Sequence, residues 1–323
     1  MNLSSVIDGA IEAPVFTSFT SIGYEARRRL ASWTDLDDYD VTGRVMVITG
    51  GTSGLGRAAA DQLARNGARL ILIGRDLERT AGVCAELVRA TSNPDIEPVA
   101  ADMGDLDQVQ KACDEIIART SRLDVLLHNA GALTEERRTA PSGVEATVAS
   151  QVVGPHLMTT LLIDRLRGDT PGRVLTMSSG GMYTAGLTVR SLQMDEGSYK
   201  GAEQYARAKR AQVTLNEMWA ERIDPADVVF HALHPGWADT PGVEASLPTF
   251  RKVLGPVLRS PAEGADTAVW LAVDDEEPLR TSGDFWHDRR RRSIHKLPTT
   301  RKTDTPERRA ALWEWVEEQI APA

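Results

Sequence analysis

Short runs rich in Val, Ile and Leu alternate along this chain with longer segments whose apolar residues recur at helical spacing. Runs of this kind are typical of strands buried on both faces. A repeated strand–helix unit folds with parallel strands joined by right-handed crossovers. We therefore predict an α/β chain, a single-domain doubly wound Rossmann fold with about seven parallel strands. The strands are expected at 44–49, 69–74, 96–100, 124–128, 173–177, 228–233 and 283–286, and the helices at 54–66, 77–91, 105–120, 142–168 and 202–222.

The length of 323 residues and the hydrophobic content of 41% allow one large core, so one domain fits better than two small ones. We expect this domain over residues 41–290, an amino-terminal extension packed on it over 1–40, and a carboxyl-terminal extension with a helix over 291–323. Prolines interrupt segment 241–262, which follows the sixth predicted strand. Ligands in such folds lie beyond the carboxyl ends of the strands, so this segment is predicted to be a substrate lid, with a plain surface connection as the alternative.

Charge and cysteine content exclude several classes of function. A net charge of −9 argues against a nucleic-acid binder, which would carry a basic face. The basic run Arg289–Arg292 is expected to be a solvated surface segment rather than a phosphate or lipid contact. Cys84 and Cys113 form no metal or redox spacing, as in a reducing compartment. Residues 1–40 lack the pattern of a signal peptide, and no later run is expected to be long enough to span a membrane, so a cytoplasmic protein is expected.

Glycines crowd the turn between the first predicted strand and the helix that follows it. Glycine lets the chain turn tightly and lets a ligand approach the backbone, while the free amides at the start of a helix favour a pyrophosphate. The spacing is G-x-x-x-G-x-G, which differs from the commoner G-x-G-x-x-G. In its place after the first strand, this turn predicts a dinucleotide site. It reads Thr49-Gly50-Gly51-Thr52-Ser53-Gly54-Leu55-Gly56.

The end of the second predicted strand is where dinucleotide folds distinguish the two adenosine riboses. An acid there would hold a free 2′-hydroxyl, but this strand ends on glycine followed by Arg75, which can fork onto a 2′-phosphate. Asp76 either points at the ribose or caps the next helix. We therefore expect NADP(H), with NAD(H) as the alternative. Asp102 and Met103, after the third strand, are placed to reach the adenine, and a turn-forming role for Asp102 is the competing interpretation.

Tyr205 and Lys209 form the one Tyr-x-x-x-Lys pair of the chain. In a helix over 202–222 this spacing puts the phenol and the ammonium on one face. A nearby ammonium favours the phenolate, so we expect Lys209 to lower the pKa of Tyr205 toward working pH, as a general acid or base requires. Ser178 and Ser179 follow the fifth strand, where a hydroxyl could hold the substrate oxygen, although such a pair is also typical of a turn or a helix cap.

These residues together resemble the short-chain dehydrogenase/reductase family over about residues 41–290. The family's glycine turn is matched by Thr49–Gly56 and its Asn-Asn-Ala-Gly element by His128–Gly131. Its catalytic serine is matched by Ser179, and its Tyr-x-x-x-Lys pair by Tyr205 and Lys209. Within the family, Ser178–Met182, His234–Val243 and Gly264–Thr267 are similar to an orphan dehydrogenase/reductase group over nearly the whole chain, and that group offers no substrate to carry over.

The resemblance implies an oxidoreductase acting on a small molecule, with homodimers or homotetramers as the usual assemblies. It also implies that Lys209 binds the nicotinamide ribose and that Pro235, Gly236 and Thr240 hold the nicotinamide end. The residues expected to bind the cofactor are Gly50, Thr52, Ser53, Gly54, Leu55, Gly56, Arg75, Asp102, Met103, Asn129, Ala130, Gly131, Lys209, Pro235, Gly236 and Thr240.

The chain departs from the family at one catalytic position. The family's catalytic asparagine should stand three residues before Gly154, where this chain has Gln151. Glutamine carries the same amide on a longer arm, so the proton relay either survives with shifted geometry or is lost. The leading His128 also differs, and a packed strand-end histidine is the plainer interpretation. His231 and His234, three apart on a predicted strand, point to opposite faces, so no metal is expected.

Two functions remain open from the sequence. The first is an NADP(H)-dependent enzyme that interconverts an alcohol and a carbonyl on a mid-sized, fairly apolar substrate, with Ser179, Tyr205, Lys209 and Gln151 as its catalytic residues. The alternative is a cofactor-binding regulatory or scaffold protein without turnover, suggested by Gln151. A screen of carbonyls and alcohols distinguishes the two.

Overall fold

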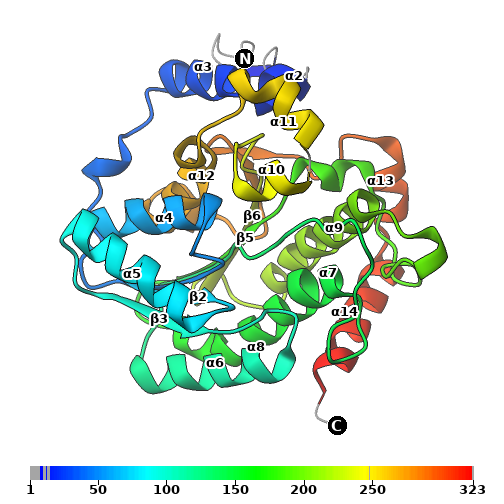
Figure 1. Cartoon of the computed structure of the whole chain (residues 1–323), viewed down its shortest axis with the longest axis horizontal. Helices are drawn as coiled ribbons and strands as arrows, with labels where there is room; N and C mark the ends of the chain where they lie inside the picture. Colours follow the sequence, from blue (N-terminus) through cyan, green and yellow to red (C-terminus); the bar gives the residue numbers. More distant parts are fainter. Residues whose placement is uncertain (1–7, 10–11, 13–14, 247, 322–323) are drawn as a thin grey trace.

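The computed structural model describes residues 8–9, 12, 15–246 and 248–321 of the chain. One eight-stranded sheet runs through the molecule in the order β3-β2-β1-β4-β5-β6-β7-β8, with helices on both faces (Figure 1). Strands β1 to β7 pair in parallel, and β8 pairs antiparallel with β7. The predicted doubly wound α/β fold is confirmed, and the sheet has one antiparallel strand more than predicted. The strands are β1 Val45–Thr49, β2 Arg69–Gly74, β3 Ile96–Ala100, β4 Val125–His128, β5 Gly172–Met177, β6 Val228–Leu233, β7 Phe285–His287 and β8 Arg290–Arg292.

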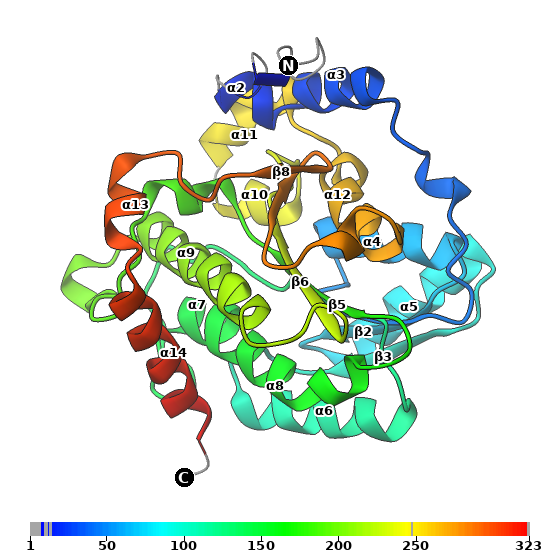
Figure 2. The same ribbon diagram turned by 180° about the vertical axis from the view of Figure 1, so that it is seen from behind.

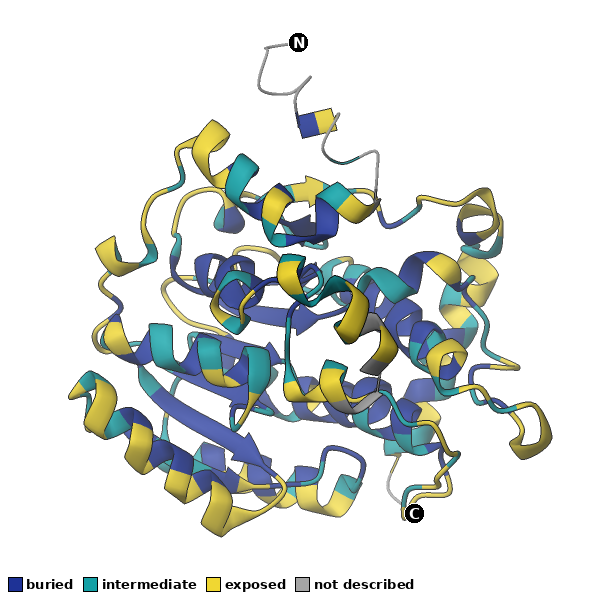
Figure 3. Cartoon of the chain, turned by 45° about the horizontal axis from the view of Figure 1, so that its top comes forward, coloured by how far each residue is buried: buried dark blue, intermediate teal, exposed yellow. Residues whose placement is uncertain are grey.

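Alternate side chains of the strands feed two separate cores. On β1, Met46 and Ile48 pack with α4, α5 and α12, whereas Val47 packs with α6 and α8 on the other face. Figure 3 shows the strands buried and the helices exposed on their outward faces. The helices are α2 Val15–Phe19, α3 Ser21–Ala31, α4 Gly54–Arg65, α5 Leu77–Thr91, α6 Leu106–Arg119, α7 Ala146–Val148, α8 Gly154–Leu166, α9 Gly201–Ala220, α10 Pro241–Ser246, α11 Pro248–Leu254, α12 Pro261–Val273, α13 Pro298–Thr303 and α14 Pro306–Ile320.

Local sequence signals set where these helices begin. At α5, the Asp76 carboxylate accepts a hydrogen bond of 2.7 Å from the Arg79 amide. At α12, Ser260 and Glu263 form a reciprocal capping box, and Pro261 occupies the first helical turn, where its missing amide hydrogen costs nothing. These caps satisfy amides that the helix itself cannot pair.

The termini lie on the outside of the sheet's helical layers. Helices α2 and α3 lie beside α11 at one end of the molecule in both views (Figures 1 and 2), and the Ser21 hydroxyl donates to the Val257 carbonyl at 3.2 Å. Helix α14 packs along α9, where Arg309 pairs with Glu217. The domain boundaries at 40/41 and 290/291 stay predictions.

The prediction of a solvated surface segment at Arg289–Arg292 was wrong for Arg289 and Arg292, whose side chains are largely buried, whereas Arg291 is exposed. Residues 290–292 form the edge strand β8, and their arginines meet carboxylates from distant parts of the chain. Arg292 pairs with Asp8 at 2.7 Å, and Arg289, which is buried, pairs with Asp266 at 2.7 Å. A run of like charges is therefore neutralised from outside the run. The preceding strand also begins later than predicted, at Phe285.

Segment 241–262 is broken, as its prolines predicted. It forms the short helices α10 and α11, a single turn of 3₁₀-helix at Gly255–Val257, and then the start of α12. Arg251 of α11 pairs with Asp239 at 2.7 Å and with Glu244 of α10 at 2.7 Å, which holds the two helices together.

Within the part of the chain that the structure describes, one helix, Ala146–Leu166, is long and apolar enough by composition to cross a membrane, so the expectation that no run has this length was too strict. Of its most apolar window, 72% is buried inside the protein. The core helix of a doubly wound fold has this property, because it faces the sheet and its neighbouring helices.

Candidate active site

The carboxyl ends of four neighbouring strands carry the predicted site. In the sheet order, β1, β4, β5 and β6 lie side by side and point the same way. The segments that leave these strands are therefore brought to one edge, although they lie far apart in sequence. They begin at Gly50, Asn129, Ser178 and His234.

Asn129 braces the glycine turn. Its side-chain Nδ2 donates to the carbonyls of Thr49 at 3.0 Å and Gly50 at 3.2 Å. Gly50 has a φ of +67°, and a Cβ on Gly56 would lie 2.3 Å from Asn129 Nδ2, so both positions require glycine. The backbone amides of Asn129 and Ala130 also both donate to the Thr49 hydroxyl at 3.0 Å. Asn129 therefore fixes the conformation of the glycine turn.

The start of α4 has the features of an anion site. Ser53 occupies the N-cap position in an extended conformation and makes no side-chain capping bond, so the first amides of the helix have no cap from it. A Cβ on Gly54 would lie 3.4 Å from the Thr240 side chain, which brings the loop after β6 over the same helix start. Thr52 belongs to the same turn, and Leu55, in the first turn of α4, packs against the core. This cradle fits the pyrophosphate of a dinucleotide.

At the end of the site predicted to hold the adenosine, Asp76 and Asp102 are hydrogen-bonded within the protein, and Arg75 differs from them. Asp76 caps α5, as one of its two interpretations predicted. The Asp102 carboxylate accepts from the Gly104 amide at 2.8 Å, so it also makes a turn, and the neighbouring Met103 is buried. Arg75 is exposed after β2, and within the described residues no hydrogen bond or ion pair engages its guanidinium. The Asp76 carboxylate is thus engaged in the helix cap, beside an exposed Arg75.

The presumed reaction centre lies where α9 passes the end of β5. The Lys209 ammonium is buried, donates to the Met177 carbonyl at 2.9 Å, and lies 5.3 Å from the centre of the Tyr205 ring. The Ser179 hydroxyl accepts from the Gly181 amide at 3.2 Å and lies near enough to the Tyr205 phenol to oppose the rise in its pKa. The structure thus brings Ser179, Tyr205 and Lys209 together, whereas Ser178 turns away and donates to the Lys209 carbonyl at 3.4 Å.

The prediction that Lys209 lowers the pKa of Tyr205 was wrong for the chain taken alone. Burial raises the pKa of the Tyr205 phenol to about 12, and the Ser179 hydroxyl opposes this only in part. Burial also lowers the pKa of the Lys209 ammonium to about 7. The ammonium sits against the ring and a carbonyl rather than the phenol oxygen, and its own charge is disfavoured, so desolvation outweighs attraction.

Gln151 lies in a five-residue π-helix, Ala149–Val153, between α7 and α8. Its Nε2 donates to the Ala132 carbonyl at 2.8 Å, while its buried Oε1 has no hydrogen-bond partner among the described residues. A Cβ on Gly131 would lie 2.9 Å from this Oε1 and 3.3 Å from Lys209 Nζ. The glutamine and the lysine therefore face one small space, and a buried amide oxygen without a partner fits a water or ligand there.

Pro235, Gly236 and Thr240 follow β6. Gly236 has a φ of +77°, and the Thr240 hydroxyl accepts from the Val243 amide at 3.3 Å at the start of α10. His231 points elsewhere, with its Nε2 2.8 Å from the Pro278 carbonyl. His128 packs in the core with its Nε2 2.9 Å from the Thr159 hydroxyl, and burial lowers its pKa to about 3.

Two contributors to this site escaped sequence reasoning. They are the carbonyls of Met177 and Ala132, which hold the Lys209 ammonium and the Gln151 amide. A backbone carbonyl leaves no trace in the residue type, so only the fold could reveal them. Among the described residues, no group of three or more His, Cys, Asp or Glu side chains could hold a metal ion.

Comparison with known proteins agrees with this arrangement. The family profile described as short chain dehydrogenase matches residues 44–249. The chain is 37% identical over 300 residues to Dehydrogenase/reductase SDR family member 12 of Bos taurus, covering 93% of each chain. It is 36% identical over 272 residues to a candidate daunorubicin C-13 ketoreductase of Streptomyces sp. (strain C5), covering 84% of this chain and 91% of that protein.

Among solved structures, the active-site complex of Pseudomonas aeruginosa RhlG with NADP superposes with a TM-score of 0.63 at 21% identity, covering 76% of this chain and 94% of that one. This likeness supports the fold. The resemblance inferred from the motifs is confirmed by the family profile and the relative at 37% identity. The chain belongs to the short chain dehydrogenase family and is an oxidoreductase of that family, whose members use NAD(H) or NADP(H) on small-molecule substrates.

Proposed function

We propose that the chain is an NADP(H)-dependent oxidoreductase that interconverts an alcohol and a carbonyl on a mid-sized, fairly apolar substrate. The observation that carries this proposal is the meeting of Ser179, Tyr205 and Lys209 beside the glycine turn. The name of the Streptomyces relative, a daunorubicin C-13 ketoreductase, supports a carbonyl substrate. The cytoplasmic location stays a prediction.

In the proposed reduction, a bound nicotinamide supplies the hydride. Tyr205 then gives its phenol proton to the oxygen of the substrate as negative charge develops there. The raised pKa keeps this phenol protonated at neutral pH, so the proton is in place before reaction. Ser179 Oγ holds the same oxygen by a hydrogen bond. In alcohol oxidation the proton moves the other way, and Tyr205 is the base.

Lys209 and Gln151 complete the proposed proton path. Lys209 Nζ, with a pKa of about 7, can exchange a proton near neutral pH. The unpartnered Oε1 of Gln151 faces the same space and can hold a water beside it. Thr240, Pro235 and Gly236 would hold the nicotinamide end, and the glycine turn the pyrophosphate.

Helices α10 and α11 are proposed to cover the substrate. They follow Thr240 directly, and the side chain of Val253 on α11 is 70% exposed. A screen of carbonyls with NADPH and NADH, and of alcohols with the oxidised cofactors, tests the function. Failure of all substrates despite tight cofactor binding would favour the alternative of a cofactor-binding protein without turnover.

Cofactor preference provides the first prediction. If Arg75 binds the 2′-phosphate, NADPH should bind roughly tenfold or more tightly than NADH, because a charge-assisted hydrogen bond contributes about 1.5–3 kcal/mol. Arg75→Ala should remove most of this difference. Arg89→Ala changes another exposed arginine, on α5, and should leave the preference intact. Equal affinities of the unmodified protein for the two cofactors in a fluorescence titration would refute the assignment.

Gln151 provides the second prediction. Gln151→Asn keeps the amide and should leave kcat within about tenfold, whereas Gln151→Leu removes the free Oε1 and should lower kcat more than cofactor affinity. Gln212→Leu is the matched control, because Gln212 is also a buried glutamine with an unpartnered Oε1. Steady-state kinetics beside cofactor titration separate the two effects. Normal turnover in Gln151→Leu would mean that this residue only packs the helix.

A further inference from the structure

A buried arginine stands directly behind the turn proposed to hold the nicotinamide. The side chain of Arg259 is 1% exposed, and its Nη1 donates to the Pro235 carbonyl at 3.3 Å. A Cβ on Gly236 would lie 2.3 Å from Arg259 Nε and 2.4 Å from its Cζ. The guanidinium therefore presses on the backbone of the turn, and only glycine at 236 leaves room for it.

Residues 18–20 of the amino-terminal segment also bind the Arg259 guanidinium. Arg259 Nη2 donates to the Ser18 carbonyl at 2.9 Å, and Nε donates to the Thr20 carbonyl at 3.3 Å. Between them, the Phe19 carbonyl accepts from the Trp237 amide at 2.7 Å. Residues 18–20 thus run along the segment that follows the Pro235–Gly236 turn, although more than two hundred residues separate them in sequence.

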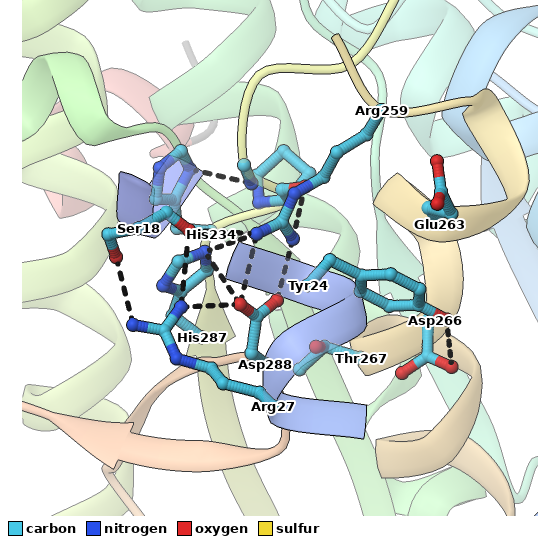
Figure 4. A network of polar contacts seen from close by, with 12 residues as sticks. Ser18, Tyr24, Arg27, His234, Arg259, Glu263, Asp266, Thr267, His287 and Asp288 are labelled. Atoms are coloured by element: carbon cyan, nitrogen blue, oxygen red, sulfur yellow. Dashed lines mark hydrogen bonds and ion pairs between the residues drawn. The ribbon is translucent and has the colours of Figure 1, made fainter. Parts of the chain in front are cut away.

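Asp288 fixes the position of Arg259. Its carboxylate accepts from Arg259 Nη1 at 2.6 Å and Nη2 at 2.9 Å, and from Arg27 Nη1 at 2.6 Å. Figure 4 shows the two arginines converging on this carboxylate. Asp288 is 1% exposed, and Arg27 is also 1% exposed. A buried bidentate contact of this kind holds a guanidinium in one orientation, since breaking it would leave a charge buried and unpaired.

The backbone that carries Asp288 is strained. Asp288 and Arg289 form the two-residue turn between β7 and β8, with φ values of +54° and +52°. Such turns normally use Asn-Gly or Asp-Gly, because both positions require the left-handed region. Here neither residue is glycine, and each is held by ion pairs, Asp288 with two arginines and Arg289 with Asp266. Strain that the surroundings maintain is typical of functional frameworks.

The same cluster also reaches the serine turn. The Gly236 amide donates to His234 Nδ1 at 3.3 Å, and the ring of His234 lies edge-on to Phe19 with centroids 4.3 Å apart. A Cβ on Gly180 would lie 2.8 Å from Phe19 Cε2 and 3.0 Å from His234 Nε2. Gly180 immediately follows Ser179. The amino-terminal segment therefore packs against both turns that flank the proposed reaction.

We propose that Arg259 is a positioning residue for the nicotinamide end of the cofactor site, oriented by Asp288 and by the amino-terminal residues 18–27. The proposal rests on the proposed function, because it assigns the Pro235–Gly236 turn to the nicotinamide. The amino-terminal segment is then part of the cofactor site, because it holds Arg259 in place. Arg259 does not touch the reacting atoms in this account. It acts through the carbonyl and the backbone of the turn.

Comparing the whole cofactor with its adenosine half tests the positioning role. Arg259→Met should weaken NADPH binding by about tenfold or more, since misplacing a contact surface loses the binding energy of that part of the ligand. The same variant should bind adenosine 2′,5′-bisphosphate within about twofold of the unmodified protein, because among the described residues no hydrogen bond or ion pair joins Arg259 to Arg75 or to the glycine turn. Isothermal titration of the purified full chain measures both affinities.

Arg173→Met is the matched control. Arg173 is also a buried arginine, which donates to the Leu271 carbonyl at 3.0 Å and pairs with Asp275, but it lies near the start of β5, at the opposite end of the strand from the site. This variant should lose thermal stability to a similar extent and keep both affinities. If Arg259→Met does not fold, Arg27→Met, which removes the second arginine on Asp288 together with its contacts to Asp8, Glu12 and the Ser18 carbonyl, should show the same selective loss at smaller size.

The two possible failures are distinguishable. If the unmodified protein binds both ligands and Arg259→Met or Arg27→Met weakens both equally, or neither, the positioning role is overturned and the proposed function stands. If the unmodified protein binds neither NADPH nor adenosine 2′,5′-bisphosphate, the proposed function falls and the positioning role with it.

Discussion

Tyr205→Phe should lower kcat for carbonyl reduction by roughly 100- to 10,000-fold, the range over which a positioned proton donor contributes. NADPH affinity and the thermal midpoint should hardly change. The phenol oxygen acts only when charge develops on the substrate oxygen, so its loss falls on the transition state. The ring itself remains, and with it the packing against the Lys209 ammonium at 5.3 Å.

The measurement is NADPH oxidation with the best carbonyl of the screen, beside NADPH binding by fluorescence. Tyr199→Phe is the matched control, because the Tyr199 hydroxyl lies just before α9 and donates instead to Glu145 at 3.1 Å. That variant should keep kcat within about threefold, as expected for a hydroxyl whose ordinary hydrogen bonds, with Glu145 and Thr134, do not involve Ser179 or Lys209. Full turnover in Tyr205→Phe would show that the chemistry is wrongly assigned.

Lys209→Ala should have the second-largest effect, and a different signature. The ammonium is proposed to hold the nicotinamide ribose and to exchange protons in the relay, so kcat should fall by about 100-fold or more and NADPH affinity by about tenfold or more. The variant also leaves the buried Met177 carbonyl without its donor, and should be less stable for that reason.

Lys200→Ala provides the control for this second prediction, since Lys200 is exposed at the start of α9. Its kinetics and affinity should match those of the unmodified protein. A Lys209→Ala variant that binds NADPH normally while losing turnover would confine the lysine to the proton path and remove its proposed ribose contact.

The order of strands and helices was predictable because the evidence for it is local. A buried parallel strand is mostly apolar, so 69–74 and 228–233 were predicted with the observed bounds. The less apolar run 96–100 was also predicted with the observed bounds, and it forms the edge strand β3. Periodicity and prolines likewise placed α5 and broke up segment 241–262. The Tyr205–Lys209 pair needed only the periodicity of a helix.

The edge strand β8 was not predictable in this way. Its three arginines predicted a surface segment, because charged side chains are normally solvated. The carboxylates that neutralise them belong to residues 8, 12 and 277. Ion pairs over such separations leave no local pattern. The same holds for the cluster of Arg259, Asp288 and Arg27. Nothing in the sequence pattern singled these residues out, and only the folded chain brings them together.

The residues of the site could be predicted from the sequence, but the pKa of Tyr205 could not. The pairing of a phenol with an ammonium predicted a lowered tyrosine pKa, whereas burial raises it to about 12. Desolvation depends on what surrounds both groups in three dimensions, which spacing along a helix cannot supply. The π-helix that turns Gln151 toward Lys209 was equally invisible, since its residues also suit an ordinary helix.

Transfer of the hydride itself tests the central claim most directly. The unmodified protein would be incubated with NADPH deuterated at the transferring position and with the carbonyls of the screen, and the products examined by mass spectrometry. The account predicts an alcohol that carries a single deuterium on the carbinol carbon, formed by the unmodified protein and scarcely by Tyr205→Phe. Tight binding of NADPH with no deuterium in any product, across carbonyls of varied size and polarity, would contradict it.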